Sequence, residues 1–327
     1  MRIAIVGAGA IGGWIGARLA HSGEQVSVLA RNETLAAIRS NGLQLQSGEQ
    51  TIKADVAASD RPAELGPQDL VVVALKGPAL VAAAPAIAQL LGPATAVLSA
   101  MNGIPWWFFS GLHGPLMGKS LQSVDPGGVV SAEISPERVI GCVVHASCTK
   151  AAPGVSVHKM GNGMIFGEPG GAHSERITQA ATAFRKAGFD ITVSTRIQQD
   201  IWYKLWGNMT MNPISALTAA TADRILDDPL VRSFILRVMA EAAEVGGRIG
   251  CPITESGEDR MQVTRKLGAF RTSMLQDAEA GRALEIDMLL GAPREIAGLL
   301  QLPTPEMDAL HGITRLFAAV RGLNPPR

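Results

Sequence analysis

The chain has few cysteines, no net charge and no long hydrophobic run. Its three cysteines are an odd number without metal-ligand spacing (Cys142, Cys148 and Cys251), which suits a reducing compartment better than a disulfide scaffold. The 29 basic and 29 acidic residues give a formal charge of +0, so the sequence lacks the basic excess of a nucleic-acid-binding protein. Glycine, proline or charge interrupts each apolar run before the roughly 18 to 20 residues of a membrane span.

The start of the sequence leads us to expect no targeting leader. The segment 1–6 leads directly into an expected strand and a glycine turn, which leaves no room for a charged leader and a cleavage site. We therefore expect a cytoplasmic protein without a membrane or nucleic-acid partner. With 327 residues, 47% of them hydrophobic, the chain is long enough for two domains.

The first half of the sequence alternates short apolar strands with helices, which predicts an α/β fold with a buried parallel sheet. A Rossmann-type doubly wound domain is expected over 1–194 and an all-helical domain over 195–327. The expected strands are 3–6, 25–30, 69–75, 94–100, 138–147, 155–159 and 190–194. The expected helices of the first domain are 11–22, 32–41 and 78–91.

A glycine-rich turn follows the first expected strand and opens a helix, as a G-x-G-x-x-G dinucleotide-binding turn requires. In that pattern the first glycine permits the turn, the second lets a phosphate approach the backbone, and the third lets helix and strand pack closely. The competing interpretation is a glycine turn without a ligand. The cofactor-binding candidates here are Gly7, Ala8, Gly9, Ala10, Ile11 and Gly12.

Three further polar residues follow expected strands, at the sheet edge where doubly wound folds bind ligands. Arg31 stands where an acidic residue would hold a ribose diol, and its guanidinium suits a 2′-phosphate. This predicts NADP(H) as the cofactor, unless Arg31 is a solvated loop charge. Lys76 is expected to meet the cofactor phosphate or ribose. Asn102 could reach the nicotinamide ribose or a substrate, although Asn-Gly is also a common turn pair.

Polar residues spaced four apart interrupt an apolar helical segment at Lys204, Asn208 and Asn212. On a helix they span about 80° of the circumference and form one polar stripe. Lys204 is the only member that can carry a positive charge or donate a proton, so it is a candidate general acid. The two amides can bind a carbonyl or hydroxyl group. The alternative is a lysine at a domain interface with amides that satisfy backbone groups.

A second polar segment contains Ser273 and Glu285. Twelve helical residues would place these two about 120° apart, so they converge only if the chain bends near Gly281. Considered alone, Glu285 is more typical of a solvated surface acid. Asp277 or Asp287 could be a helix cap or an ion-pair partner.

Together these motifs resemble the ketopantoate reductase family (2-dehydropantoate 2-reductase) over nearly the whole chain. The resemblance implies a substrate held in a cleft, with NADPH as hydride donor. It also implies that Lys204 is the general acid, that Glu285 positions it or holds the substrate hydroxyl, and that Ser273 meets the carboxylate. Asn102, Asn208 and Asn212 would orient the substrate. The implied reaction reduces 2-dehydropantoate to (R)-pantoate, a precursor of pantothenate and coenzyme A.

The segment 104–128 is longer than in the shortest family members, and it contains four consecutive aromatic residues, 106–109. These could form a lid or alter the substrate pocket, but packing against the sheet or a subunit is the favoured interpretation. An altered pocket leaves open a reductase of another 2-oxo acid. A separate alternative, of a different class, is an NADPH-sensing protein without turnover. The apolar helical half would suit a homodimer.

Overall fold

The computed structural model describes residues 1–324, and the chain forms two compact units. Unit 1 consists of Met1–Met101 and Gly128–Ile197, and unit 2 consists of Asn102–Gly127 and the chain from Gln198 onward. The continuous domains expected at 1–194 and 195–327 differ from these units mainly in one segment. Residues 102–127 belong to the helical unit, because their aromatic side chains pack with its helices, as described below.

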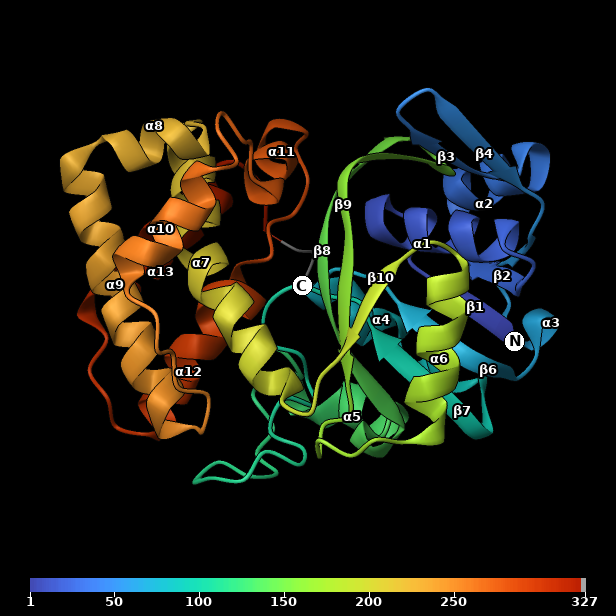
Figure 1. Cartoon of the computed structure of the whole chain (residues 1–327), viewed down its shortest axis with the longest axis horizontal. Coiled ribbons are helices and arrows are strands. Elements are labelled where there is room, and N and C mark those ends of the chain that lie inside the picture. The colour runs from blue at the N-terminus through green and yellow to red at the C-terminus, as the bar shows by residue number, and fades with distance from the viewer. Residues whose placement is uncertain (325–327) are drawn as a thin grey trace. The chain divides into compact units, whose positions relative to one another are not determined.

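Unit 1 carries a ten-stranded sheet in the order β4-β3-β9-β8-β7-β6-β1-β2-β5, with β10 paired to β9 (Figure 1). The path β5-β2-β1-β6-β7-β8 is parallel throughout and has the Rossmann order. The Rossmann-type fold expected from the sequence is therefore confirmed. The strands are β1 (Arg2–Val6), β2 (Gln25–Leu29), β3 (Leu43–Ser47), β4 (Gln50–Ala54), β5 (Ala57–Ser59), β6 (Gln68–Val73), β7 (Leu91–Ser99), β8 (Val139–Ala152), β9 (Val155–Gly167) and β10 (Asp190–Val193).

The helices that connect these strands are α1 (Ala10–His21), α2 (Asn32–Asn41), α3 (Pro62–Leu65), α4 (Gly77–Ala88), α5 (Val129–Glu133) and α6 (Glu175–Lys186), with 3₁₀ turns η1 (Pro126–Gly128) and η2 (Pro136–Arg138). Of these, α1, α2 and α4 lie close to the positions that the sequence predicted, and the others were not predicted. The strands β3, β4 and β5 were not predicted. β4 is largely exposed and β5 has only 3 residues, so neither shows the apolar run that marks a buried strand.

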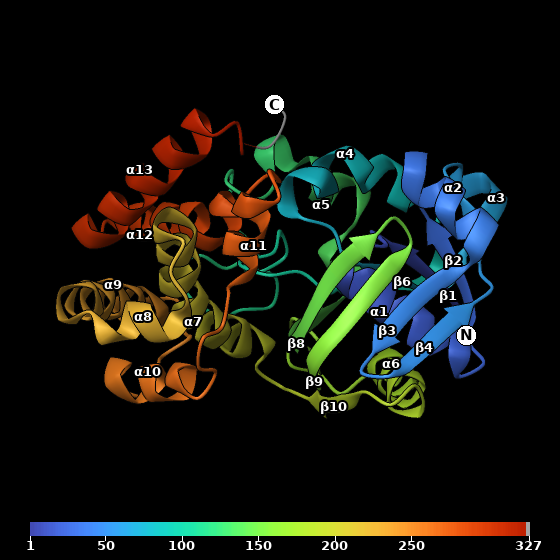
Figure 2. The same ribbon diagram turned by 90° about the horizontal axis from the view of Figure 1, so that it is seen from above.

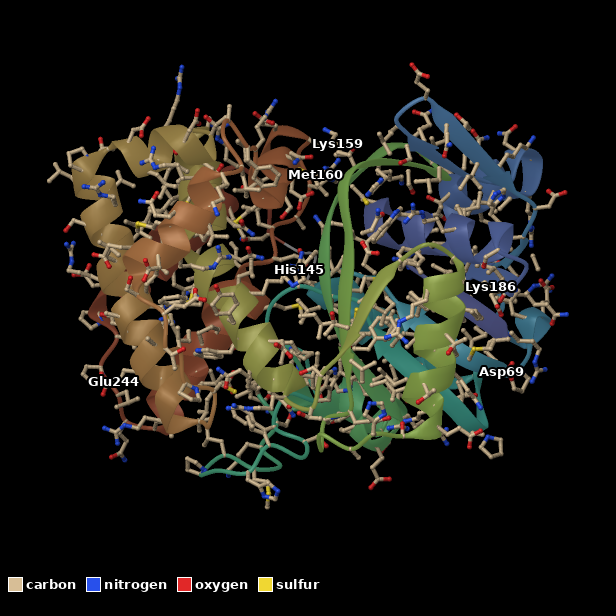
Figure 3. All side chains as sticks on the ribbon, viewed as in Figure 1. Asp69, His145, Lys159, Met160, Lys186 and Glu244 are labelled. Atoms are coloured by element: carbon tan, nitrogen blue, oxygen red, sulfur yellow. The ribbon has the colours of Figure 1, made fainter. Side chains whose placement is uncertain are left out.

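The core of unit 1 surrounds α1, which contacts strands from both ends of the sheet order, including β2, β3, β4 and β9. Figure 2 shows β3, β4, β8 and β9 passing over this helix. Trp14 of α1 is 0% exposed, packs edge-on against Phe189 and stacks on His158. His158, to which the sequence assigned no functional role, is thus a packing residue of this core. His145 lies exposed on β8 (Figure 3).

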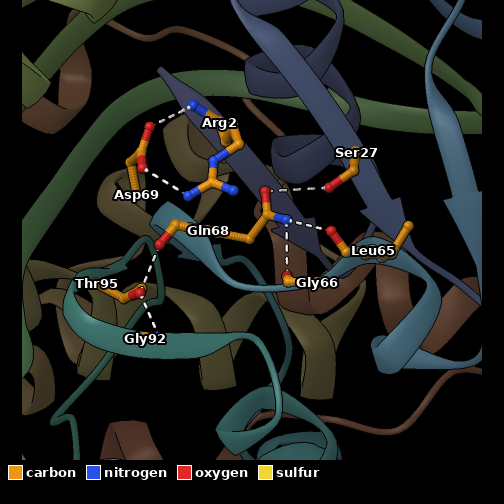
Figure 4. Close-up of polar contacts among 8 residues, drawn as sticks. All are labelled: Arg2, Ser27, Leu65, Gly66, Gln68, Asp69, Gly92 and Thr95. Atoms are coloured by element: carbon orange, nitrogen blue, oxygen red, sulfur yellow. Dashed lines mark hydrogen bonds and ion pairs between the residues drawn. The ribbon is translucent and has the colours of Figure 1, made fainter.

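A polar network closes the amino-terminal edge of the parallel strands (Figure 4). The Gln68 side chain donates to the carbonyl oxygens of Leu65 and Gly66 at 2.9 Å each, and its own oxygen accepts from the Ser27 hydroxyl. The backbone N–H of Arg2 donates to the Asp69 carboxylate at 2.7 Å. These polar groups satisfy one another, so this edge is structural and the opposite, carboxyl edge is the candidate for ligands.

Unit 2 is helical, as expected. Its elements are α7 (Ile197–Thr218), which begins at the last residue of unit 1, α8 (Ala222–Asp227), α9 (Pro229–Arg248), α10 (Gly257–Arg265), α11 (Ser273–Glu279), the π-helical turn η3 (Asp287–Gly291), α12 (Ala292–Leu299) and α13 (Pro305–Val320). Asp228 caps α9 by accepting from the N–H groups of Leu230 and Val231. Within residues 1–324, no helix has the length and apolarity to cross a membrane.

The aromatic segment is part of the core of unit 2. Trp106, Trp107, Phe108 and Phe109 are each at most 4% exposed, and the Phe108 ring lies 6.2 Å from that of Trp202 on α7. The Gln198 side chain donates to the Ser110 carbonyl at 3.1 Å and fixes the segment to the same helix. Packing was the favoured interpretation, but the partner identified here is a helix of unit 2.

Candidate functional site

The glycine turn in unit 1 leaves no room for side chains where the backbone closes on itself. Gly7 has φ +96°, and a Cβ there would lie 2.7 Å from the Ala74 carbonyl oxygen. A Cβ on Gly12 would lie 2.1 Å from the Gly7 carbonyl oxygen. By contrast, a Cβ on Gly9 would meet nothing within 4 Å among the described residues. The second glycine therefore faces open space, as a ligand approaching the backbone requires.

The amino end of α1 is suited to an anion. Its N-cap, Gly9, supplies no side-chain hydrogen bond, and its first turn contains no acidic residue. The first amides of a helix have no intrahelical acceptor and lie at the positive end of the helix dipole. The residues of this turn thus fit a dinucleotide pyrophosphate.

Ser156 on β9 supports this turn and was not identified from the sequence. Its hydroxyl donates to the Gly9 carbonyl oxygen at 3.1 Å, and a Cβ on Gly13 would lie 1.9 Å from that hydroxyl oxygen. The two positions are 147 residues apart, so only the packing of α1 against β9 could reveal the contact.

Arg31 and Lys76 lie at the carboxyl ends of neighbouring parallel strands. Val6 pairs with Leu29 of β2 and with Val73 of β6, so these three strands end at one level beside the glycine turn. Arg31 is the exposed N-cap of α2, and Lys76 is the half-buried N-cap of α4. Both cations thus lie at the edge that carries the glycine turn, as the sequence predicted.

In unit 2 the structure joins Lys204 of α7 directly to Asn102. The Lys204 ammonium group donates to the Asn102 Oδ1 atom at 2.8 Å. Both side chains are half-buried. Because Oδ1 accepts from the ammonium, the Asn102 side-chain N–H₂ group can donate elsewhere. The pair therefore combines a cationic hydrogen-bond donor with an amide held by it.

The other two members of the stripe lie on the same helix. Asn208 is half-buried and Asn212 is 7% exposed. The helix continues through Pro213 to Thr218, so this proline does not end it. Three polar side chains thus follow one helical stripe, with the lysine at its amino-terminal end.

The π-helical turn η3 holds the backbone next to Asn102. Gly103 has φ +76°, and a Cβ there would lie 2.5 Å from the Met288 carbonyl oxygen. The Ile104 N–H donates to the same oxygen at 3.0 Å. Glu285 is half-buried and lies three residues before Met288. The fold thereby brings the segment that carries Glu285 to the segment that carries the partner of Lys204. Neither η3 nor Met288 was identified from the sequence.

Ser273 is the first residue of α11, and its side chain is exposed. No hydrogen bond in the described part of the chain joins it to the Lys204–Asn102 pair. The bend expected near Gly281 is present, because α11 ends at Glu279 and Gly281 has φ +64°. The Arg282 Nε atom lies 2.8 Å from Asp277 Oδ1, which confirms Asp277 as an ion-pair partner.

Two family models cover most of the chain. "Ketopantoate reductase PanE/ApbA" matches residues 3–171, and "Ketopantoate reductase PanE/ApbA C terminal" matches residues 196–318. A curated relative, 2-dehydropantoate 2-reductase of Mesorhizobium japonicum, is 44% identical over 98% of this chain and 99% of its own length.

Solved structures agree with this assignment. A structure described as a putative ketopantoate reductase from Ralstonia solanacearum MolK2 has a TM-score of 0.95 and 54% identity, over 98% of this chain and 99% of that one. A 2-dehydropantoate 2-reductase from Geobacter metallireducens GS-15 has a TM-score of 0.84 and 28% identity, over 97% and 99% of the two chains. The family consists of nicotinamide-dependent oxidoreductases that act on a CH–OH group. The chain therefore belongs to the ketopantoate reductase family.

Proposed function

We propose that the protein reduces 2-dehydropantoate to (R)-pantoate with NADPH, a step toward pantothenate and coenzyme A. The observation that carries this proposal is the 2.8 Å hydrogen bond from Lys204 to Asn102, which holds a proton donor in a fixed position. The relative that shares 44% of its sequence with this chain bears the name 2-dehydropantoate 2-reductase, which supports the same substrate.

In this proposal unit 1 holds the cofactor. The glycine turn Gly7–Gly12 and the amino end of α1 bind the pyrophosphate, because the Gly9 position is open and the helix end is uncapped. Arg31 binds the 2′-phosphate and thereby favours NADPH over NADH. Lys76 adds a second cation at the same edge. The nicotinamide, when bound, supplies the hydride for the carbonyl carbon of the substrate.

Unit 2 supplies the proton. As the carbonyl carbon gains a hydride, its oxygen becomes an alkoxide, and the Lys204 ammonium stabilises this charge and donates a proton to it. Asn102 keeps the ammonium in place, so that little reorientation is needed during the reaction. Asn208 and Asn212 offer amides along the same stripe for the substrate hydroxyl or carbonyl. Glu285 then positions Lys204 or accepts from the substrate hydroxyl, and Ser273 donates to the carboxylate.

The burial of residues 106–109 bears on the alternative substrate. A pocket widened or covered by these four rings would need them at its surface, whereas each is at most 4% exposed. The main sequence argument for a different 2-oxo acid is thereby weakened.

A substrate panel tests the proposed function. Purified protein is mixed with NADPH and, separately, 2-dehydropantoate, pyruvate, 2-oxoisovalerate and phenylpyruvate, and the loss of NADPH absorbance is recorded. We expect the highest kcat/KM with 2-dehydropantoate. If several 2-oxo acids oxidise NADPH while 2-dehydropantoate does not, the substrate is wrong and the reaction class stands.

A further inference from the structure

Lys150 of β8 reaches the amino end of α2, where Arg31 is located. The Lys150 Nζ atom lies 3.5 Å from the Thr34 hydroxyl oxygen. Thr34 is the third residue of α2, and Arg31 is the N-cap of the same helix. Side chains at these two helix positions are neighbours, since they form the reciprocal hydrogen bonds of a capping box where the residue types allow it. The Lys150 ammonium therefore lies at the same helical turn as Arg31.

The turn between β8 and β9 packs on α2 and so fixes the position of Lys150. Gly154 in this turn has φ +73°, and a Cβ there would lie 3.2 Å from Ile38 Cγ1 on α2. The Gln44 N–H donates to the Gly154 carbonyl oxygen at 2.9 Å, which joins the turn to β3 as well. The approach of Lys150 to α2 is thus a consequence of how this hairpin packs.

The register of the hairpin relates Lys150 to the glycine turn. Lys150 pairs with Ser156 across the antiparallel strands β8 and β9, and side chains of directly opposed residues lie on one face of a sheet. The Ser156 hydroxyl donates to the Gly9 carbonyl oxygen at 3.1 Å. The face of the hairpin that carries Lys150 therefore meets the amino end of α1 through Ser156 and the amino end of α2 through Lys150 itself.

The charges at this turn of α2 are not balanced within the protein. Arg31 and Lys150 are both exposed, and neither has a carboxylate within 4.0 Å among residues 1–324. The acidic residue in the first turn of α2, Glu33, pairs with neither of them. Lys76 follows β6, which β1 separates from β2, so that lysine is based about 10 Å from the end of β2. Lys150 is therefore better placed than Lys76 to act together with Arg31.

We infer that Lys150 binds the 2′-phosphate of NADPH together with Arg31. This inference rests on the proposed function, because it adds a residue to the proposed NADPH site. A phosphate monoester carries about 1.5 to 2 negative charges at pH 7, which one guanidinium does not balance. The contact with Thr34 uses one of the three N–H groups of the ammonium and leaves the others for phosphate oxygens. NADH has a hydroxyl group in place of this phosphate, so Lys150 contributes to the preference for NADPH.

The test measures cofactor binding without substrate. NADPH and NADH are titrated by fluorescence against the unaltered protein, Lys150→Met and Lys53→Met. The control removes an exposed lysine at the other end of α2, where Lys53 Cγ lies 3.5 Å from the position of a Cβ on Gly42. We expect Lys150→Met to raise the Kd for NADPH about 10-fold and the Kd for NADH less than about 2-fold. Lys53→Met should change neither.

Two further variants separate phosphate binding from a packing role. Lys150→Arg keeps the positive charge and should keep most of the preference for NADPH, whereas Arg31→Ala combined with Lys150→Met should bind both cofactors about equally. Equal losses of affinity for NADPH and NADH in Lys150→Met, or an unchanged preference, would overturn the role of Lys150 alone. If the unaltered protein binds NADPH no more tightly than NADH, the proposed cofactor is itself wrong.

Discussion

Lys204 on α7 and Asn102 in the segment 102–127 are 102 residues apart in the sequence and are joined by a hydrogen bond of 2.8 Å. The lysine comes from a long helix, whereas the asparagine belongs to an irregular segment that unit 2 holds through aromatic packing and through η3. The position of the proposed acid therefore depends on how well this segment is anchored.

Replacing Asn102 by aspartate tests the geometry of this pair. A carboxylate about 3 Å from the ammonium would stabilise its charged form and raise the pKa of Lys204. The Asn102→Asp variant should therefore remain active to higher pH, with a lower maximal kcat because the proton is held more tightly. The measurement is kcat against pH from 6 to 10. If kcat declines at the same alkaline pH in the variant as in the unaltered protein, the two side chains do not interact during turnover.

The contact between Gly103 and Met288 gives a second prediction. In Gly103→Ala, the added Cβ would meet the Met288 carbonyl oxygen at 2.5 Å, and the residue would keep an unfavourable φ of +76°. We expect the segment to shift, kcat to fall about 10-fold or more, and the melting temperature to drop. Gly298→Ala on α12 is the control, because a Cβ there meets nothing within 4 Å among the described residues. Equal behaviour of the two variants would argue against an anchoring role for η3.

Arg31 should distinguish the two nicotinamide cofactors. Its guanidinium is exposed at the start of α2, where a 2′-phosphate would be its partner in the proposed complex. Arg31→Ala should raise the KM for NADPH about 10-fold and change the KM for NADH by less than about 2-fold. Steady-state kinetics with both cofactors provide the measurement. An equal rise in KM for both cofactors would mean that Arg31 attracts phosphate groups in general and does not recognise the 2′-phosphate.

Buried His311 makes the stability of unit 2 depend on pH. The side chain is 6% exposed, and Arg294 Nη1 lies 2.8 Å from His311 Nδ1. Burial, and then the charges of Arg294 and Arg315, lower the pKa of His311 to about 4 from its ordinary value of 6.5. The neutral histidine favours the folded state above pH 6.5, and this contribution is lost as the pH falls from 6.5 toward 4. Near pH 4 the free energy of unfolding should be lower by about 3 kcal/mol for this reason.

Urea unfolding at pH 7, 6, 5 and 4 measures this contribution, with His311→Gln as the comparison. The variant lacks the titrating group, so its free energy of unfolding should fall less over the same pH range. An equal fall in the free energy of unfolding of both proteins would show that His311 is not the cause.

The sequence predicted those parts of the molecule that local patterns determine. Apolar strands and the Gly7–Gly12 turn depend on neighbouring residues, and the structure has each of them. Strands β3 to β5 were missed because short strands with exposed faces lack a continuous apolar run.

Contacts across long stretches of chain were not predictable in the same way. The sequence identified Lys204 and Asn102 separately, yet their hydrogen bond depends on where 102–127 packs, and the division at 194 placed that segment in the other domain. Ser156 and Met288 are ordinary residues in the sequence. Each contact forms only because folding brings these residues to Gly13 and Gly103, where the absence of a side chain permits close approach.

The central claim is that Lys204 donates the proton to the reduced carbonyl. Its most direct test is single-turnover oxidation of NADPH by 2-dehydropantoate in the unaltered protein and in Lys204→Ala, with NADPH affinity measured separately by fluorescence titration. We predict that the variant binds NADPH with an affinity within about 2-fold of the original and loses about 10²- to 10⁴-fold in the rate of the chemical step. An unchanged single-turnover rate in Lys204→Ala would contradict the account.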